Sequence, residues 1–415
     1  MKKMIFLLPL LALCLAFTSC SDDETTAKKY PVAVFVKGSD SIAISGVTDV
    51  LVECKNLTTG NVQTSGTLNY IASFNLAVGQ YQFTVKGKYD NADVEGVSQT
   101  VIISKVIDDF TYTVEVPLNF AAAGSSLIFK EVYFTGVPDY FWRDGFYEIV
   151  NNADTTVYLD GVILAVVDAG LPGWQPAPSV WIENGITDVY PCTSYTVYFP
   201  GTGKENPLAP GQSVVIATSA QNHKAQHPAD NDGNEESPVD LSNADWEIFI
   251  PTSSSDTDNP DVPNLEVAYG PFGLDFMPAT DGKNALILAR LEPGTTPADF
   301  VAEDNNYGYK PGTSFPKTLL IPRQYVIDAI DVVSAPASDR YKKLQKEDDR
   351  SCVFVDAGLD ATGQYNPAEY SGRGLRRKVV SVTGGVAKFK DTNNSEADFV
   401  TTNPPVPHRT FTTPD

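Results

Sequence analysis

The chain has 415 residues, of which 52 are acidic and 30 basic, and its formal net charge is −22. So acidic a chain argues against nucleic acid as a partner, because the phosphates would be repelled at long range. The length is sufficient for two or three domains with proper cores. The content of glycine, proline, tyrosine and phenylalanine favours turn-rich β structure.

The N-terminus has the anatomy of a signal peptide. Two lysines precede an apolar stretch from Met4 to Phe17, which is too short to span a bilayer comfortably, and small residues then lead to Cys20. A cysteine in this position resembles the lipoprotein box of bacteria. The resemblance implies that residues 1–19 are removed and that the thiol of Cys20 carries lipid, which gives firm membrane anchoring. An ordinary secretory signal with an incidental cysteine is the alternative.

The residues after the cysteine resemble the acidic export signal of Bacteroidota lipoproteins. This signal directs such proteins to the outer leaflet of the outer membrane. The resemblance implies a lipid-anchored protein that faces the cell exterior, with residues 20–30 as an acidic tether. The export residues are Ser21, Asp22, Asp23 and Glu24.

Residues 31–121 contain short segments in which apolar and polar residues alternate, separated by Gly, Asn and Asp turns. About seven strands in such a length is the density of a β-sandwich. The stretch "NLTTGN", followed by "GQYQF", resembles an immunoglobulin-like or prealbumin-like module, in which an Asn-x-Thr-x-Gly turn joins two strands. Such modules are mostly spacers or supports for recognition.

A small-residue break, "AAAGSS" at 121–126, predicts a domain boundary. Residues 122–415 resemble a lamin-tail-like domain, an immunoglobulin-type β-sandwich found on many secreted bacterial proteins. The matching pieces are Glu131, "YEI" at 147–149, "NPLAPGQSVVIA" at 206–217, "KNALILAR" at 283–290, "YVIDAIDVV" at 325–333 and "DTNNS" at 391–395. The family core is much shorter, so we expect loop insertions near 170–200, 221–270, 299–318 and 335–370.

The expected fold is therefore all-β, with two β-sandwich domains in tandem: an immunoglobulin-like or prealbumin-like one and a lamin-tail-like one with long loop insertions. The combination resembles a Bacteroidota surface lipoprotein family without a known activity. Members of that family tend to be encoded near outer-membrane barrels and TonB-dependent receptors. The resemblance implies a binding or accessory role beside such a barrel or transporter.

Two of the three histidines stand four residues apart in "NHKAQH", a spacing that places both imidazoles on one face of a helix. An acidic residue from the following loop could complete a zinc or copper site, and the acidic turn itself suits calcium. The candidate metal ligands are His223, His227, Asp230, Asp232 and Glu235. Because Pro228 follows at once, two solvent-facing loop histidines are the alternative, and the acidic turn at 256–261 is a second calcium candidate.

A metal-assisted hydrolase that uses the loop from His223 to Asp232 is the competing function, and a cell-surface adhesion or spacer protein is the third. No catalytic residue is assigned, because the sequence contains no Gly-x-Ser-x-Gly motif, phosphate loop or dinucleotide fingerprint. A carboxylate pair for glycoside hydrolysis leaves no spacing signature.

Three tryptophans are the candidates for contact with a glycan, another small ligand or a partner protein. Trp174 and Trp181 stand in "LPGWQPAPSVW", and Trp142 stands in "YFWRDGFYE". An exposed aromatic ring beside proline is a good platform for such contacts. The alternative for Trp142 is a place in the core at the end of the sandwich.

Cysteine usage excludes a zinc ribbon and a dense disulfide scaffold, because the folded part contains only Cys54, Cys192 and Cys352, without a Cys-x-x-Cys spacing. A single bridge between Cys192 and Cys352 is one option in an oxidising compartment.

Overall fold

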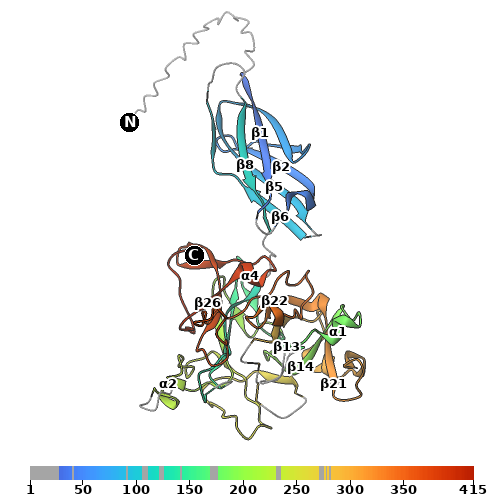
Figure 1. Cartoon of the computed structure of the whole chain (residues 1–415), viewed down its shortest axis with the longest axis vertical. Coiled ribbons are helices and arrows are strands. Elements are labelled where there is room, and N and C mark those ends of the chain that lie inside the picture. Colours follow the sequence, from blue (N-terminus) through green and yellow to red (C-terminus); the bar gives the residue numbers. More distant parts are fainter. Residues whose placement is uncertain are drawn as a thin grey trace, which may run out of the picture. The chain divides into compact units, whose positions relative to one another are not determined.

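The computed structural model describes residues 28–39, 42–89, 92–104, 111–120, 126–140, 143–168, 176–229, 235–270, 275–276, 278–279 and 282–415. The signal peptide, Cys20 and the export residues lie outside these ranges, as do Trp142, Trp174, Asp230 and Asp232. The fold is all-β and divides into two compact units, with the division after Ala121 (Figure 1). Within the described ranges, no helix has the length and apolar content needed to cross a membrane.

The first unit consists of two sheets packed face to face. One has the strand order β4-β1-β8, in which β1 and β8 run parallel; the other has the order β3-β2-β5-β6-β9, with β7 paired to β5. Its strands are β1 Lys29–Lys37, β2 Val47–Asn56, β3 Val62–Gly66, β4 Ile71–Ala77, β5 Gly79–Tyr89, β6 Ala92–Val97, β7 Val101–Ile103, β8 Tyr112–Pro117 and β9 Asn119–Phe120, with a 3₁₀ turn at Ile44–Gly46.

Alternation along the strands builds the core of this unit. In β5, the side chains of Tyr81, Phe83 and Val85 are buried, whereas the intervening residues point outward. The turn that joins β2 to β3 is held by Asn56, whose side-chain oxygen accepts hydrogen bonds from the backbone amides of Thr58 and Thr59 at 2.9 and 3.0 Å. The Asn-x-Thr-x-Gly stretch is thus a turn between two strands, as predicted.

The second unit is a larger sandwich with short helices in its connections. Its strands are β10 Leu127–Tyr133, β11 Phe146–Asn151, β12 Val157–Tyr158, β13 Ile163–Val167, β14 Val189–Tyr198, β15 Pro207–Leu208, β16 Ser213–Ala217, β17 Trp246–Glu247, β18 Glu266–Tyr269, β19 Asn284–Ala289, β20 Tyr307–Tyr309, β21 Lys317–Pro322, β22 Val326–Val332, β23 Gly374–Arg377, β24 Val379–Thr383, β25 Val386–Phe389 and β26 Phe399–Thr402. Its helices are α1 Val180–Glu183, α2 His223–Gln226, α3 Pro297–Ala302 and α4 Ser395–Asp398, with 3₁₀ turns at Asp304–Asn306, Arg323–Tyr325 and Ala337–Asp339.

Two sheets enclose the core of the second unit. One has the order β17-β16-β11-β10-β23-β26, and the other has the order β20-β21-β14-β13-β19-β22 with β18 on β14. Ile149 and Ile216 of the first sheet belong to the same buried cluster as Leu164, Leu286 and Ile330 of the second. Burying such side chains between two sheets supplies the main stabilising term of a sandwich.

The predicted strands of this unit are confirmed at 213–217, 284–289 and 326–332. The expected insertion at 170–200 is wrong in part, because it contains β14, a central strand of the seven-stranded sheet. The alternation of apolar and polar residues in β14 is interrupted, because the pairing with β13 passes from Thr196 to Cys192 at a bulge. Residues 335–370 contain no strand, as the insertion predicts.

The closing segment at 391–399 folds around Arg377, which is buried at 1% exposure. Its guanidinium donates to Asp328 at 2.8 and 2.9 Å and to Asp391 at 3.2 Å. Asp398 accepts from the backbone amide and the hydroxyl of Thr392, both at 2.7 Å. These bonds tie the start of α4 to the sheet and explain why the segment carries so many short polar residues.

All three described cysteines are free thiols, so the bridge considered between Cys192 and Cys352 is not formed. Cys192 lies within β14, where its side chain is fully buried, whereas Cys352 is half-buried in the 335–370 insertion. Burial raises the pKa of the Cys192 thiol to about 12, which makes it unreactive.

Candidate functional site

A small polar pocket lies where β11 begins and β16 ends. Phe146 of β11 pairs with Ala217 of β16, and the next residue, Thr218, continues the pair by donating its amide to the carbonyl of Gly145 at 2.9 Å. The Thr218 hydroxyl lies 2.9 Å from the carbonyl of Arg143. The end of a rigid antiparallel pair therefore fixes the back of the pocket.

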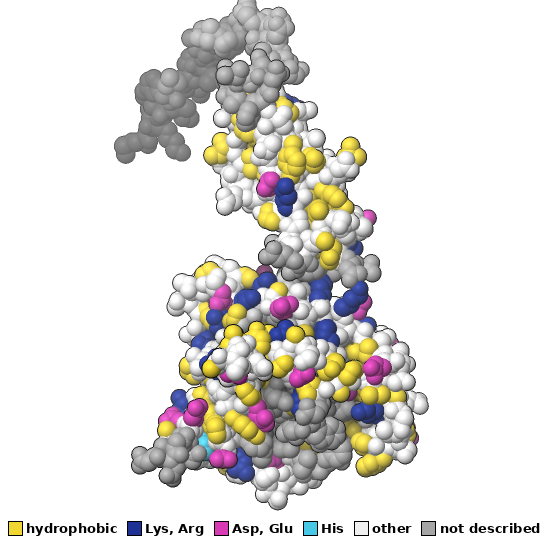
Figure 2. Space-filling view, viewed as in Figure 1, with side chains coloured by type: hydrophobic (Ala, Val, Ile, Leu, Met, Phe, Trp, Pro, Cys, Tyr) yellow, Lys and Arg dark blue, Asp and Glu magenta, His cyan; other side chains and the backbone are white. Residues whose placement is uncertain are grey.

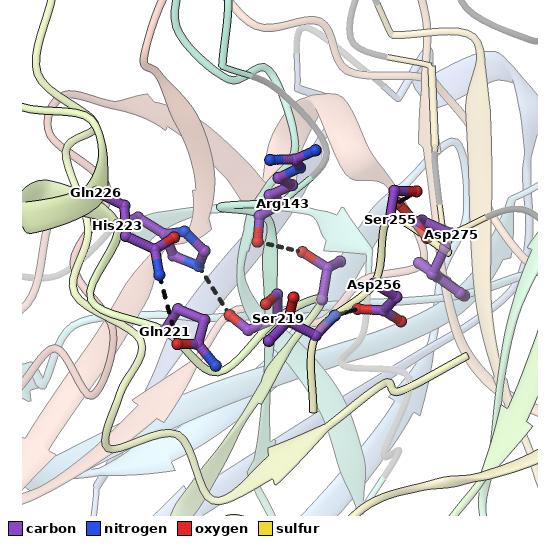
Figure 3. Close-up of a pocket in the computed structure, with 11 residues that line it drawn as sticks. Arg143, Ser219, Gln221, His223, Gln226, Ser255, Asp256 and Asp275 are labelled. Atoms are coloured by element: carbon purple, nitrogen blue, oxygen red, sulfur yellow. Dashed lines mark hydrogen bonds between the residues drawn. The ribbon is translucent and has the colours of Figure 1, made fainter. Parts of the chain in front are cut away.

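The other walls come from loops, and the cavity has a volume of about 60 Å³. In Figure 3, Ser255, Asp256 and Asp275 stand on one side, while Gln221, His223 and Gln226 stand on the other with Ser219 between them. Since one water needs about 10–15 Å³ of such space, the pocket holds a few waters or one polar group of a ligand.

The acidic side of the pocket is held by its own turn. The Asp256 carboxylate accepts the amides of Ile250 at 2.7 Å and Thr257 at 2.8 Å, and Asp275 accepts the Ser255 hydroxyl at 2.8 Å. Burial raises the pKa of Asp256 to about 6, with Asp275 adding to the rise, although the Ile250 amide lowers it. Each carboxylate oxygen of Asp256 accepts a backbone amide, and these hydrogen bonds hold the start of the acidic turn at 256–261 in place.

The opposite side is formed by His223, whose side chain is fully buried. Its Nε2 lies 2.8 Å from the carbonyl of Ser219, and its Nδ1 lies 2.7 Å from the hydroxyl of Tyr140. Burial lowers the pKa of His223 to about 4, so the ring is neutral at pH 7. A neutral ring must then donate from Nε2 to the carbonyl, which leaves Nδ1 as the acceptor nitrogen.

The two histidines lie on one side of a short helical turn, as predicted, and both of their rings contact the ring of Tyr140. α2 spans one turn from His223 to Gln226, with His227 as its C-terminal cap. The His227 ring stacks on Tyr140 with centroids 4.8 Å apart and planes 8° apart. Both ring nitrogens of His223 are thus engaged within the protein, and its role as a metal ligand stays a prediction.

Of the other metal candidates, only His227 and Glu235 lie within the described residues. Glu235 is exposed, and Asp230 and Asp232 lie outside the described residues. Among the residues that the structure describes, no group of three His, Cys, Asp or Glu side chains is arranged to hold a metal ion.

Trp181 is part of the core, so its assignment as an exposed recognition platform is wrong. It lies in α1 with 2% exposure, and its indole nitrogen has no hydrogen-bond partner among the described residues. Ser179 caps α1 by accepting the amide of Ile182, and Trp181 lies on the buried side of this single turn. α1 and α2 lie on opposite sides of the second unit (Figure 1), so Trp181 and His223 belong to different places.

The pocket also contains residues that the sequence did not single out. Arg143, Ser219 and Asp275 all lie in connections beside strands, and no motif or spacing marks them. Asp256 belonged to a recognised acidic turn, but its position across from His223 depends on how loops distant in sequence pack together.

No curated protein is similar enough to this chain in sequence to count as a match. A family model described as a protein of unknown function (DUF4876) matches residues 209–406. The crystal structure of a DUF4876 family protein from Bacteroides thetaiotaomicron is 24% identical, with a TM-score of 0.53, and the match covers 89% of this chain and 94% of that chain. The crystal structure of a candidate adhesin from Bacteroides ovatus is 10% identical, with a TM-score of only 0.21, and the match covers 82% of this chain and 98% of that chain. The chain is thus similar to the DUF4876 family in sequence over 209–406 and to a protein of that family in its fold.

Proposed function

We propose that this protein is a surface-exposed lipoprotein of the outer membrane with a binding role, accessory to an outer-membrane barrel or a TonB-dependent transporter. Lipid on Cys20 anchors it, and the loops of the second unit make the contacts. The observation that supports the binding role is the polar pocket of Figure 3, which is built from loops at the end of the β11–β16 pair. Loops held by a rigid sheet are where recognition is usually placed.

The pocket offers hydrogen-bonding groups of both kinds rather than a reactive group. Asp256 and Asp275 present carboxylates, and Gln221 and Gln226 present amides that both donate and accept. His223, the residue on which a metal-assisted hydrolase would depend, is neutral and hydrogen-bonded at both nitrogens. These contacts favour binding over hydrolysis.

The same proposal assigns the first unit to the immunoglobulin-like or prealbumin-like modules and the second to the lamin-tail-like domains. In support, β1 pairs in parallel with β8 to close the smaller sheet of the first unit. In the second unit, the segment that begins with "DTNNS" leads into α4, and its Asp391 accepts a hydrogen bond from Arg377 of β23. The first unit then acts as a spacer between the anchor and the binding loops.

The test is co-purification of the tagged, native lipoprotein from membranes under mild detergent. We expect a barrel or transporter protein to be recovered with it, and Gln226→Trp, which fills the pocket, to reduce the recovery. The matched control is Gln63→Trp on the exposed strand β3 of the first unit, which should leave recovery unchanged. Recovery of the protein alone, or equal recovery with both variants, would contradict the proposal.

The anchor is tested separately. We expect Cys20→Ala to release the protein from the membrane fraction, and the unchanged protein on intact cells to be cut by added protease. Membrane retention of the Cys20→Ala variant would refute lipid anchoring, and protection from protease on intact cells would refute surface exposure.

A further inference from the structure

A second and larger cavity lies on the outer face of the six-stranded sheet. It is a groove of about 440 Å³, whereas the pocket of Figure 3 has about 60 Å³. Ligand sites for small molecules generally have about 300–1,000 Å³, so this groove has the size of a binding site. Every residue that lines it is described by the structure.

The groove lies between two segments that pack apolar side chains on the outer face of the sheet. The hairpin β24–β25 packs Val379 and Phe389 on Ile128 and Val150 of the sheet. On the other side, the connection after β16 packs residues such as Leu241 on further outward-facing side chains of β10, β11 and β16. A strand's successive side chains alternate between faces, so the residues between these covers point into the groove instead of the core.

The floor of the groove is formed by Lys130 and Ser213, which belong to a row of mostly buried polar side chains across three adjacent strands. Lys130 stands at a β-bulge of β10, where the pairing with β11 passes from Phe129 directly to Glu131. Its ammonium donates to Glu148 of β11 at 2.6 Å and to Ser213 of β16 at 3.2 Å. Lys130 is only 5% exposed, and that remaining surface borders the groove. Bulges are often found where a side chain must be re-aimed beside a functional site.

The row continues beneath the C-terminal segment, which we define as residues 404–411. Glu131 accepts the amide of Val406 at 2.8 Å and the Arg409 guanidinium at 2.9 Å. The segment thus crosses the sheet as one wall of the groove, and His408 and Arg409 line it.

Stability alone does not explain this floor. A buried ion pair such as Lys130 with Glu148 gains little over apolar residues of the same size, because both charges lose their hydration. Glu131 and Glu148 also stand opposite each other in register, and like charges at such a position are destabilising. Polar groups kept in a sheet at a cost to stability are expected at functional sites.

The groove lining determines the class of ligand. Lys130 and Arg409 are already paired with Glu148 and Glu131, so the floor has no excess of positive charge for an anion. Asp245 adds a carboxylate near His408, at 3.6 Å from its Nε2. What remains is a mixture of donors and acceptors, and a hydroxyl, which both donates and accepts, suits such a mixture best.

Two aromatic rings complete the groove. Phe389 and Phe411 line it and pack edge to face, with centroids 5.6 Å apart and planes at 80°. An aromatic wall beside polar side chains fits a ligand with an apolar ring face and hydroxyls at the ring edge. Figure 2 shows positive and negative side chains interspersed over the visible face of the second unit.

We propose that this groove binds one or two neutral sugar rings of a glycan. The rings lie against Phe411, which is partly exposed and packs on the buried Phe389, and their hydroxyls exchange hydrogen bonds with Gln212, Asp245 and Arg409. This site is separate from the pocket of Figure 3, and its ligand does not depend on a transporter partner.

The test is isothermal titration calorimetry of the full-length lipoprotein with defined hexasaccharides. The neutral probes are maltohexaose, cellohexaose, mannohexaose and xylohexaose; hexagalacturonate and a glucosamine hexamer supply negative and positive charge. We expect a neutral probe to bind with a Kd tighter than about 1 mM and neither charged probe to match it. Gln212 is exposed at the groove, and Gln212→Trp should weaken binding at least about tenfold, a change of about 1.4 kcal/mol.

Gln63→Trp on β3 is the matched control and should bind like the unchanged protein. Thermal unfolding of both variants shows whether either change disturbs the fold. If Gln212→Trp does not fold, Thr410→Ala replaces it as a milder change in the groove wall, and it should also weaken binding. Binding of no neutral probe, preference for a charged probe, or equal binding with the groove variants and the control would overturn the proposal. Loss of a transporter partner in co-purification would leave these results unchanged, so the two proposals can fail independently.

Discussion

Glu131 and Glu148 lie directly opposite each other on β10 and β11, and both side chains are fully buried. Two carboxylates in this relationship repel each other, and each is balanced by a different cation: Arg409 holds Glu131 and Lys130 holds Glu148. Burial raises the pKa of Glu131, and the charge of Glu148 adds to the rise, although Arg409 and the Val406 amide lower it. Removing either cation would therefore leave a buried carboxylate without its counter-charge.

Glu148→Gln should destabilise the second unit by about 3–5 kcal/mol, because the Lys130 ammonium is then buried without a counter-charge. The double variant Lys130→Met/Glu148→Leu should cost less than this single change, because it removes both charges together. Urea unfolding followed by tryptophan fluorescence measures both. A double variant that costs as much as Glu148→Gln, or more, would show that the loss does not come from an unpaired Lys130 ammonium.

The buried histidine predicts a pH effect with a definite sign. Burial lowers the pKa of His223 from 6.5 to about 4, so the folded state resists protonation that the unfolded chain accepts. Its contribution to stability is full above about pH 6.5 and is lost as pH falls toward about 4. His223→Gln should be less stable than the unchanged protein at pH 7 by about 1–3 kcal/mol, and this deficit should shrink by about 2–3 kcal/mol at about pH 4.5.

Buried acids such as Asp144 change stability in the opposite direction, because burial raises its pKa to about 6. They are present in both proteins, so their effect cancels in the difference between the unchanged chain and the His223→Gln variant. A deficit that is constant from pH 7 to about pH 4.5 would show that His223 does not have a lowered pKa.

Trp181 should behave as a core residue. Trp181→Ala should cost about 3–5 kcal/mol through the cavity it leaves, whereas Trp181→Phe should cost under about 2 kcal/mol, because the indole nitrogen gives up no hydrogen bond among the described residues. Thermal or urea unfolding gives both values. If either variant weakened ligand binding without loss of stability, the recognition role rejected above would have to be restored.

Arg377→Lys should destabilise the second unit although it keeps the charge. Arg377 donates to both oxygens of Asp328 and also to the carbonyls of Phe129 and Lys390, and a lysine ammonium cannot reach all of these partners at once. A loss of about 3–5 kcal/mol is expected from a broken buried pair, measured by urea unfolding. A loss under about 1 kcal/mol would mean that the cluster tolerates a point charge.

The thiols provide a simple check on the disulfide question. Cys54 and Cys192 are buried, and burial raises the pKa of Cys54 to about 11 and that of Cys192 to about 12. Neither should react with an aromatic disulfide reagent at pH 7.5 until the protein is unfolded, while the half-buried Cys352 should react slowly. A non-reducing peptide map that joined Cys192 to Cys352 would contradict the structure.

The sequence was informative where one residue pattern decided the local structure. Alternation predicted β5, and Asn56 predicted the turn after β2, because each depends on neighbours along the chain. The resemblance to a lamin-tail-like domain predicted β16 and β19. β14 was missed, because a bulge breaks its alternation and only its pairing with β13 and β21 makes it a strand.

Site residues were harder to predict, because their surroundings also depend on contacts between segments that are distant in sequence. The spacing of His223 and His227 correctly placed both on one side of a turn, but what they would meet there depends on Tyr140, 83 residues before His223. Trp181 was judged exposed from the prolines around it, whereas it lies on the buried side of α1. The groove floor combines residues from β10, β11 and β16, and no spacing in the sequence marks such a set.

The position of β10 at the centre of its sheet has a consequence for how the second unit is assembled. β10 lies between β11, which follows it closely, and β23, and the bond from Arg377 to the carbonyl of Phe129 spans 248 residues. Contacts of such high sequence separation must wait for the chain between them, and closing so long a loop slows folding. While the polypeptide is being synthesised or threaded through a translocase, β10 can therefore pair on one side only. Its other edge stays open, and a chaperone that shields exposed strand edges would be needed during that interval.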